Sequence, residues 1–321
     1  MNPWTICYFS GTGGTKRIAE EMKDKMGKGT KWYSLDAPIP IERIAKRLRK
    51  TKRLVLLYPV HATDAPLPVY HFLTQLRHIL PDLSSTKVAV VSVSAGGDMW
   101  PNTSCRDRVK ERLERLGGQV VHESMMVMPS NWLVETNVQA SLWLMRSLPK
   151  AVDQVCQNLM ASESSLDQVA HGQELASNVG KDTDYETIEA KHKKAKKQPW
   201  LARQEKHNAR RFGKQLKTND QCTSCGWCER SCPALNIQLD PEGKPVFHDR
   251  CMQCMRCVYG CPEQAIVSRS KQVLKNGYDL AALEQWGQNV TLVSIDACTK
   301  GAIWKGVRAY LHQVNDPVPS E

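Results

Sequence analysis

The chain has 321 residues, of which 41% are hydrophobic, enough for two domains with buried cores. Its formal net charge of +11 comes almost entirely from residues 191–217, which hold eleven lysines and arginines but a single acid. No uninterrupted apolar run approaches the roughly 18 residues of a membrane-spanning helix, and the N-terminus lacks the basic and apolar segments of a secretory signal. We therefore expect a cytoplasmic protein without a membrane span.

Short apolar stretches alternate with amphipathic ones through residues 1–160, the pattern of a parallel sheet covered by helices on both faces. We expect strands at residues 5–9, 31–35, 53–60, 87–93 and 119–128. Helices are expected after the first strand, with Ile18, Ala19 and Met22 on one face, and at residues 41–48, 67–80, 106–116 and 140–160. Five strands in this length predict an α/β fold, a flavodoxin-like doubly wound five-stranded parallel sheet.

The composition changes three times in the rest of the chain. Residues 161–180 are polar without clear periodicity and lead into the basic segment, so we expect a linker over 161–217. Eight cysteines then fall within residues 218–270, which we expect to form a small α+β domain. Residues 271–321 follow as a tail with two expected helices, at 280–286 and 303–314.

The eight clustered cysteines form an internal repeat, in which the spacing Cys-x2-Cys-x2-Cys-x3-Cys-Pro occurs twice. This spacing is typical of bacterial ferredoxins with two 4Fe–4S clusters. Three closely spaced thiolates can hold three corners of one cubane, while the fourth, beside a proline, reaches the other cluster. We therefore expect one cluster on Cys222, Cys225, Cys228 and Cys261, and the other on Cys251, Cys254, Cys257 and Cys232.

A disulfide framework and a pair of zinc sites are the alternatives for these cysteines. Disulfide-rich domains are typical of secreted chains, and nothing else in this sequence fits that class. A zinc ribbon builds one tetrahedral site from two Cys-x2-Cys pairs, so it needs neither a third cysteine in register nor the repeated Cys-Pro. Iron–sulfur clusters therefore explain the pattern best.

A glycine-rich loop joins the first strand to the first helix. Glycines let backbone amides approach a phosphate, and the helix N-terminus supplies partial positive charge. The loop has neither the Gly-Lys-Ser/Thr order of a Walker A loop nor the G-x-G-x-x-G of a dinucleotide site, and its three hydroxyls suit a terminal monophosphate. Its residues are Ser10, Gly11, Thr12, Gly13, Gly14 and Thr15.

Two further loops follow the third and fourth strands, at carboxyl ends that should meet at the same edge of the sheet. The first loop carries Pro59, Val60 and His61. The second carries Ser94, Gly96, Gly97, Asp98 and Trp100. We expect the three loops together to form a binding site, with His61 a loop residue rather than a catalytic acid.

These three loops resemble those that bind FMN in flavodoxins. The glycine-rich loop resembles the FMN-phosphate loop, with Gly14 in place of the usual asparagine, and the other two resemble the loops that flank the flavin. The resemblance implies that Gly97 and Asp98 offer backbone groups to the pyrimidine edge of FMN and that Trp100 stacks on its ring.

Together with the cysteine repeat, these loops make the chain resemble the flavodoxin–ferredoxin fusion family over residues 1–160 and 218–270. The segment that follows the fifth strand, Met128-Pro129-Ser130-Asn131-Trp132, also resembles that family. The resemblance implies FMN in the first domain, two 4Fe–4S clusters in the second, and electron transfer between them.

The basic segment at residues 191–217 has three interpretations. We favour a solvated linker, or a helix that docks on an acidic face of this same chain. Steering of acidic redox partner proteins comes second, and nucleic-acid binding is the least favoured.

The predicted cofactors favour an electron carrier or a small reductase module. Clusters exchange single electrons, whereas FMN accepts one or two, so the pair can convert between one- and two-electron chemistry. Two other classes stay open. One is a redox-sensing regulatory protein whose cluster state controls binding of a partner or nucleic acid, and the other is an enzyme that reduces a small molecule at the flavin.

Overall fold

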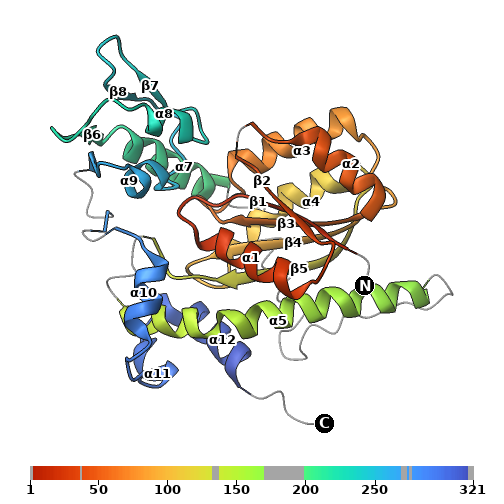
Figure 1. The fold of residues 1–321 in the computed structure, drawn as a ribbon. Helices are drawn as coiled ribbons and strands as arrows, with labels where there is room; N and C mark the ends of the chain where they lie inside the picture. The colour runs from red at the N-terminus through yellow and green to blue at the C-terminus, as the bar shows by residue number, and fades with distance from the viewer. Residues whose placement is uncertain are drawn as a thin grey trace.

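The computed structural model describes residues 3–36, 38–131, 137–169, 199–268, 273–274 and 277–316. The first part of the chain forms a five-stranded parallel sheet with strand order β2-β1-β3-β4-β5 (Figure 1). The strands are β1 (Thr5–Tyr8), β2 (Lys31–Ser34), β3 (Arg53–Pro59), β4 (Lys87–Ser94) and β5 (Gln119–Val127). This order is that of flavodoxin-like doubly wound sheets, so the predicted fold class is confirmed.

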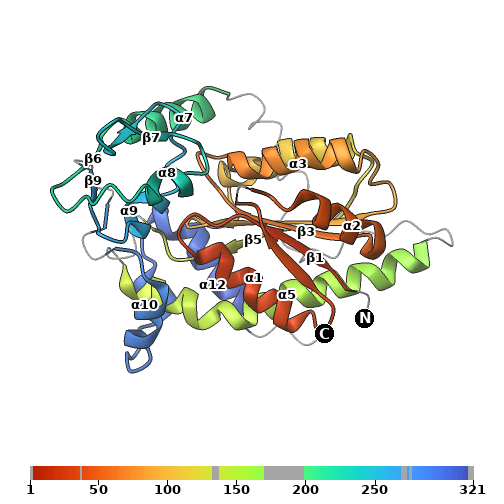
Figure 2. The same ribbon diagram turned by 45° about the horizontal axis from the view of Figure 1, so that its top comes forward.

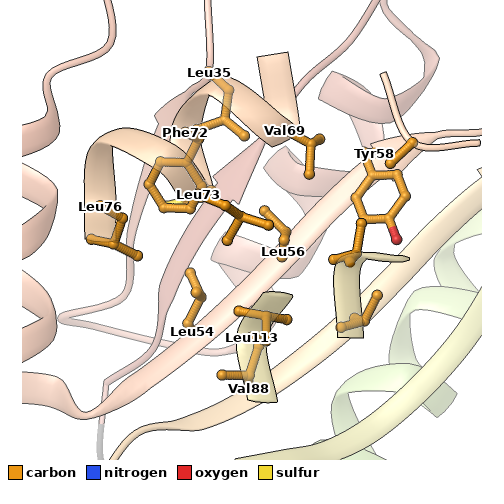
Figure 3. Close-up of a cluster of buried hydrophobic side chains, with 14 of the residues drawn as sticks. Leu35, Leu54, Leu56, Tyr58, Val69, Phe72, Leu73, Leu76, Val88 and Leu113 are labelled. Atoms are coloured by element: carbon orange, nitrogen blue, oxygen red, sulfur yellow. The ribbon is translucent and has the colours of Figure 1, made fainter. Parts of the chain in front are cut away.

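Alternating side chains of the central strands fill two cores, one on each face of the sheet. On one face Leu54, Leu56 and Tyr58 of β3 pack against Phe72 and its neighbours (Figure 3). The helices on this face are α2 (Ile41–Thr51), α3 (Leu67–Ile79) and α4 (Asp107–Glu114).

The opposite face buries Val55 and Leu57 of the same strand. Two helices cover it, α1 (Gly14–Lys25) and α5 (Val138–Val169), and the predicted apolar face of α1 at Ile18, Ala19 and Met22 is buried there. Strands of a parallel sheet are buried on both faces, which explains the unbroken apolar run of β3.

Two helices of this domain differ from their predicted ranges. The helix predicted at 106–116 begins as a 3-10 turn, η1 (Asn102–Arg106), and α4 then ends before the left-handed Gly117, whose φ is 78°. Helix α5 continues to Val169, nine residues past the end predicted at 160. The polar composition after residue 160 removes the apolar periodicity on which that prediction depended.

The C-terminal tail packs on α5 and completes that face of the first domain (Figure 1, Figure 2). Val307 and Leu311 are buried with Val127 of β5 and Leu144 of α5. The tail contains α10 (Leu280–Gly287), α11 (Ile295–Cys298), the 3-10 turn η3 (Ala302–Trp304) and α12 (Lys305–Asn315). The two predicted helices are thus present, and the four-residue α11 is too short to show a period in the sequence.

The cysteine module contains two small antiparallel sheets and two short helices. Strand β6 (Leu216–Thr218) pairs with β9 (Ile266–Ser268), and β7 (Ile237–Leu239) pairs with β8 (Pro245–Phe247). Helices α8 (Trp227–Ser231) and α9 (Arg256–Gly260) each contain the third cysteine of one run. Because β6 starts at Leu216, the regular structure of the cysteine module begins slightly before residue 218, the predicted start of this domain.

Most of the described part of the basic segment forms the helix α7 (Pro199–Gly213), and the segment ends in β6. Residues 191–198 lie outside the described residues. Ala209 and Phe212 are buried, and Lys206 donates a hydrogen bond of 2.9 Å to the carboxylate of Asp64 in the first domain. The contact is compatible with a helix that docks on this same chain, the second form of the interpretation that we favoured, and the role of the segment stays a prediction. Among the described helices, none combines the length and apolar character that crossing a bilayer requires.

The contact between Lys206 and Asp64 gives a testable expectation. Asp64 also accepts a hydrogen bond of 2.9 Å from Arg108, so Lys206→Ala removes one of two ion pairs and should weaken docking by about 0.5–1 kcal/mol. Amide hydrogen exchange of the peptide covering α7 should accelerate about two- to fivefold. The control is Arg203→Ala on the same helix, where equal acceleration would mean that helix charge, and not this contact, is responsible.

Candidate functional site

The two cysteine runs fold with the same local backbone. Ser224 and Gln253 occupy equivalent positions in the repeat, and both are left-handed, with φ of 56° and 57°. Gly226 and Met255, two residues further on, match in the same way, with φ of 70° and 62°. Left-handed backbone is strained in residues other than glycine and persists where the surroundings require it. Each run therefore wraps its cysteines in the same tight turn.

These turns bring the first group of thiols around one cavity. The group takes three cysteines from the first run and the last cysteine of the second. The lining cysteines are Cys222, Cys225, Cys228 and Cys261. Burial raises the pKa of the Cys228 thiol, and the neighbouring Cys261 and Cys222 add to the rise. The four cysteines predicted to share a cluster thus lie together.

The second group combines the remaining thiols. Burial raises the pKa of Cys251 to about 11 and that of Cys254 to about 12, and the charge of Cys232 adds to both shifts. Burial also raises the pKa of Cys257, with further contributions from the nearby Cys254, Cys251 and Cys232 and from Cys228 of the first group. Cys232 of the first run therefore lies among the cysteines of the second. Thiols whose pKa is raised in this way, as in Cys251, Cys254 and Cys257, become thiolates when a cation holds them.

Backbone amides point at the cysteine that closes each run. The amide of Asn236 donates to Cys232 Sγ at 3.3 Å, and the amide of Ala265, its equivalent in the repeat, donates to Cys261 Sγ at 3.4 Å. Hydrogen bonds of this kind stabilise thiolate ligands and tune iron–sulfur clusters. In the described part of the chain, no three His, Cys, Asp or Glu side chains converge as a single metal ion would need.

The glycine-rich loop has a shape that suits a phosphate. Gly13 is left-handed with φ of 99°, and its amide donates to Ser10 Oγ at 3.1 Å. The first turn of α1, which Gly14 and Thr15 open, contains no acidic residue. An anion at this helix N-terminus would therefore meet partial positive charge without a competing carboxylate.

A cavity of about 740 Å³ opens beside this loop, a size within the range of small-molecule sites. Thr12 and Gly13 line it together with Lys16 and Arg17 of α1. Tyr259 of the cysteine module and Tyr278 of the tail line its other side. The cavity is therefore formed jointly by both domains and the tail.

The other two predicted loops meet the first at the carboxyl edge of the sheet. Because β1, β3 and β4 are neighbours, Val60 can donate its amide to Val93 at 2.8 Å, and the ring of His61 lies edge-on to Phe9 with centroids 6.1 Å apart. None of the residues predicted to flank the flavin is among those lining the 740 Å³ cavity. The loops thus converge, but the cavity opens toward the cysteine module.

The second loop differs from what the flavodoxin resemblance implies. The amide of Gly97 donates to Ser94 Oγ at 2.9 Å, and its carbonyl accepts from Asn102 Nδ2 at 3.2 Å, so both backbone groups are engaged within the loop. Asp98 pairs through its carboxylate with the buried Arg106 at 2.9 Å. The contact of Gly97 and Asp98 with the pyrimidine edge of a flavin therefore stays a prediction, and it would require these loop hydrogen bonds to be exchanged or shared.

His61 makes the first loop sensitive to acid. Its Nδ1 is enclosed and has no hydrogen-bond partner among the described residues. Burial, together with the charge of Arg256, lowers the pKa of the imidazole to about 4. The unfolded chain binds this proton near pH 6.5, so the folded state should lose stability as the pH falls from 6.5 toward 4.

We therefore expect His61→Leu to reduce the fall in apparent melting temperature between pH 7 and pH 5.5. One buried histidine should contribute about 2–4 °C to that fall. His122, whose pKa burial also lowers to about 4, is the matched comparison, and His122→Leu should reduce the fall by a similar amount. An unchanged pH dependence in His61→Leu would show that the ring binds its proton equally well in the folded and the unfolded chain.

Several contacts at this edge were not predicted from the sequence. A Cβ on Gly11 would lie 2.6 Å from the carbonyl oxygen of Cys254, so the second cysteine run lies directly on the phosphate loop. Arg256 reaches the same loop. Asn131 donates to Thr12 Oγ1 at 3.4 Å and accepts through its carbonyl from Tyr259. Packing between domains creates the contacts of Cys254, Arg256 and Tyr259 with the first domain, and residue spacing carries no signal for them.

Comparison with known proteins supports the two halves to different degrees. Residues 221–266 match the family model of the 4Fe-4S dicluster domain. A ferredoxin from Pyrobaculum islandicum is 38% identical over 53 residues, which are 16% of this chain and only 50% of that protein's length.

Flavodoxins are among the similar solved structures, at low overall scores. A WrbA-like flavodoxin from Agrobacterium tumefaciens is 14% identical with a TM-score of 0.32, covering 37% of this chain and 76% of that one. A Fusobacterium nucleatum flavodoxin mutant bound to flavin mononucleotide is 17% identical with a TM-score of 0.30, covering 41% and 71%. The flavodoxin-like assignment therefore depends on the observed strand order. The chain joins a flavodoxin-like domain to a ferredoxin domain of the 4Fe–4S dicluster type, as its resemblance to the flavodoxin–ferredoxin fusion family implied.

Proposed function

We propose that the protein transfers electrons between two 4Fe–4S clusters and a bound FMN, as a carrier or a reductase module in a reducing cytoplasm. The observation that carries this proposal is the contact of the second cysteine run with the phosphate loop, at Cys254 and Gly11. Electron transfer requires that redox groups lie close together, and this contact is where the two predicted cofactor sites meet.

In this proposal each cluster is held by one of the two crossed groups of cysteines. Cys222, Cys225, Cys228 and Cys261 hold the first, and Cys251, Cys254, Cys257 and Cys232 hold the second. The cavity lined by the first four cysteines supports the crossed grouping. The repeated left-handed turns and the amide-to-sulfur hydrogen bonds support a ligand role for both runs, because both are found in each half. The crossing makes each cluster depend on both runs.

The phosphate of FMN would be held by the amides and hydroxyls of the loop from Ser10 to Thr15. When bound, FMN supplies a group that takes up one or two electrons, whereas the clusters pass single electrons. His61, neutral at physiological pH, adds no charge beside it. The cavity beside the loop supports a ligand at the phosphate end of this edge. The orphaned Nδ1 of His61 supports a polar ligand at the first flanking loop, which does not line that cavity.

A redox-sensing role is the second candidate, and one contact favours it. A Cβ on Gly213, the last residue of α7, would lie 2.3 Å from Cβ of Cys251, so the basic helix ends against a predicted cluster ligand. A change at that cluster could shift a helix rich in exposed cations and alter the binding of an acidic partner protein.

Anaerobic purification followed by iron, sulfide and flavin quantification tests the proposal. We expect about eight irons and one FMN per chain, and reduction of both cofactors by a low-potential donor without any substrate. A protein that holds eight irons but stays free of flavin at saturating FMN would contradict the flavin half of the proposal. A sensor would instead change its affinity for a partner on oxidation, and an enzyme would show substrate-dependent reoxidation of the flavin.

A further inference from the structure

Arg256 lies between two predicted ligands of the second cluster, Cys254 and Cys257. Its Nη1 donates to the carbonyl of Ser231 in the cysteine module at 3.4 Å, while the guanidinium also reaches the first domain. Its Nη2 donates to the carbonyl of Ser10, and its Nε donates to the carbonyl of Gly11 at 3.4 Å. The guanidinium therefore holds two consecutive peptide groups of the phosphate loop.

Further contacts fix Arg256 in this position. Its Nη1 lies 2.6 Å from the carboxylate of Asp36, at the end of β2, and its guanidinium carbon lies 5.1 Å from the centroid of the Phe9 ring. Only 16% of the side chain is exposed. A rigid guanidinium that is paired with a carboxylate, placed over an aromatic ring and largely enclosed loses little further conformational freedom when it binds the loop.

Holding these two carbonyls also aims the amides that would meet a phosphate. In a planar trans peptide the C=O and the N–H point in opposite directions. With the carbonyls of Ser10 and Gly11 turned toward Arg256, the amides of Gly11 and Thr12 point away from it. The side chain from the cysteine module thereby sets the orientation of amides at the start of the phosphate loop.

We propose that Arg256 is a positioning residue that couples assembly of the second cluster to FMN binding. This inference rests on the proposed function. The cluster fixes the turn from Cys254 to Cys257, the turn fixes Arg256, and Arg256 orients the phosphate loop. Because linkage between two binding sites is reciprocal, FMN should in turn stabilise the second cluster.

FMN titration of the anaerobic, cluster-loaded protein tests this coupling, with flavin fluorescence as the readout. Arg256→Gln should raise the Kd for FMN about tenfold or more, because it removes charge-assisted hydrogen bonds. Arg256→Lys keeps the positive charge but loses the planar, forked donors of the guanidinium. Its Kd for FMN should lie between those of the wild type and Arg256→Gln. Arg250→Gln, an exposed arginine beside the same run, is the matched control and should stay within about twofold of the wild type.

A second arm tests the role of the cluster. Cys254→Ala should also weaken FMN binding about tenfold, and adding Arg256→Gln to it should cause little further loss, because both act through the same turn. Two results would overturn this inference and leave the proposed function intact. One is an FMN affinity within twofold of the wild type in iron-replete Arg256→Gln, and the other is losses of affinity that add in the double variant. A wild-type protein with eight irons and no FMN binding would overturn the proposed function as well.

Discussion

The double substitution Cys225→Ala/Cys261→Ala is expected to remove about four irons per chain, no more than either single substitution removes. By contrast, Cys225→Ala/Cys232→Ala is expected to remove all of about eight irons, although both cysteines belong to the same run. The reason is the crossed grouping, in which Cys225 shares a cavity with Cys261 while Cys232 lies among the cysteines of the second run. Alanine is used because a serine oxygen could replace the missing sulfur.

Iron and acid-labile sulfide per chain, measured after anaerobic purification, decide the result. If each run held its own cluster, the two double variants would exchange their iron contents, and the crossed assignment would be wrong. Cys298→Ala is the control, because this cysteine lies in the tail at the end of α11 and should leave the iron content unchanged. Loss of one cluster should also destabilise the module, whose apolar core contains few buried side chains.

The sheet and the cysteine grouping could be predicted because each depends on local pattern. The buried strand expected at residues 53–60 is found as Arg53–Pro59, since a strand buried on both faces is apolar throughout. The spacing of the repeat likewise predicts the crossed thiol groups, and the cavity lined by Cys222, Cys225, Cys228 and Cys261 is compatible with that prediction. The local turn of each run is encoded by neighbouring residues, which the sequence displays directly.

Contacts between the parts of the chain could not be predicted in this way. Arg256 stands between two cysteines in the sequence, and nothing in that position indicates that it reaches the carbonyl of Gly11. The packing of Val307 and Leu311 on the first domain likewise depends on how the tail folds back. The engaged amide of Gly97 is a property of loop closure, which the resemblance to flavodoxins did not anticipate.

The contact between the second loop and the tail should be the most sensitive to added volume. Gly97 is left-handed with φ of 89°, and a Cβ there would lie 2.5 Å from the carbonyl carbon of Gly306 in α12. Gly97→Ala should therefore combine backbone strain with displacement of the helix and lower stability by about 2–4 kcal/mol. Gly27→Ala is the control, because Gly27 has a similar φ of 83° and open space around it, and it should cost only the strain of about 1–2 kcal/mol.

Gly306→Ala separates this contact from backbone effects. Within a helix, replacing glycine by alanine ordinarily stabilises by about 1 kcal/mol, yet here the new Cβ would lie 2.1 Å from the carbonyl oxygen of Gly96. We expect the substitution to lower the apparent melting temperature instead, and to add little to Gly97→Ala, because both force the same separation. A rise in melting temperature for Gly306→Ala would mean that α12 does not rest on the second loop. In that case the tail would not contact the edge of the sheet where the three predicted cofactor loops meet.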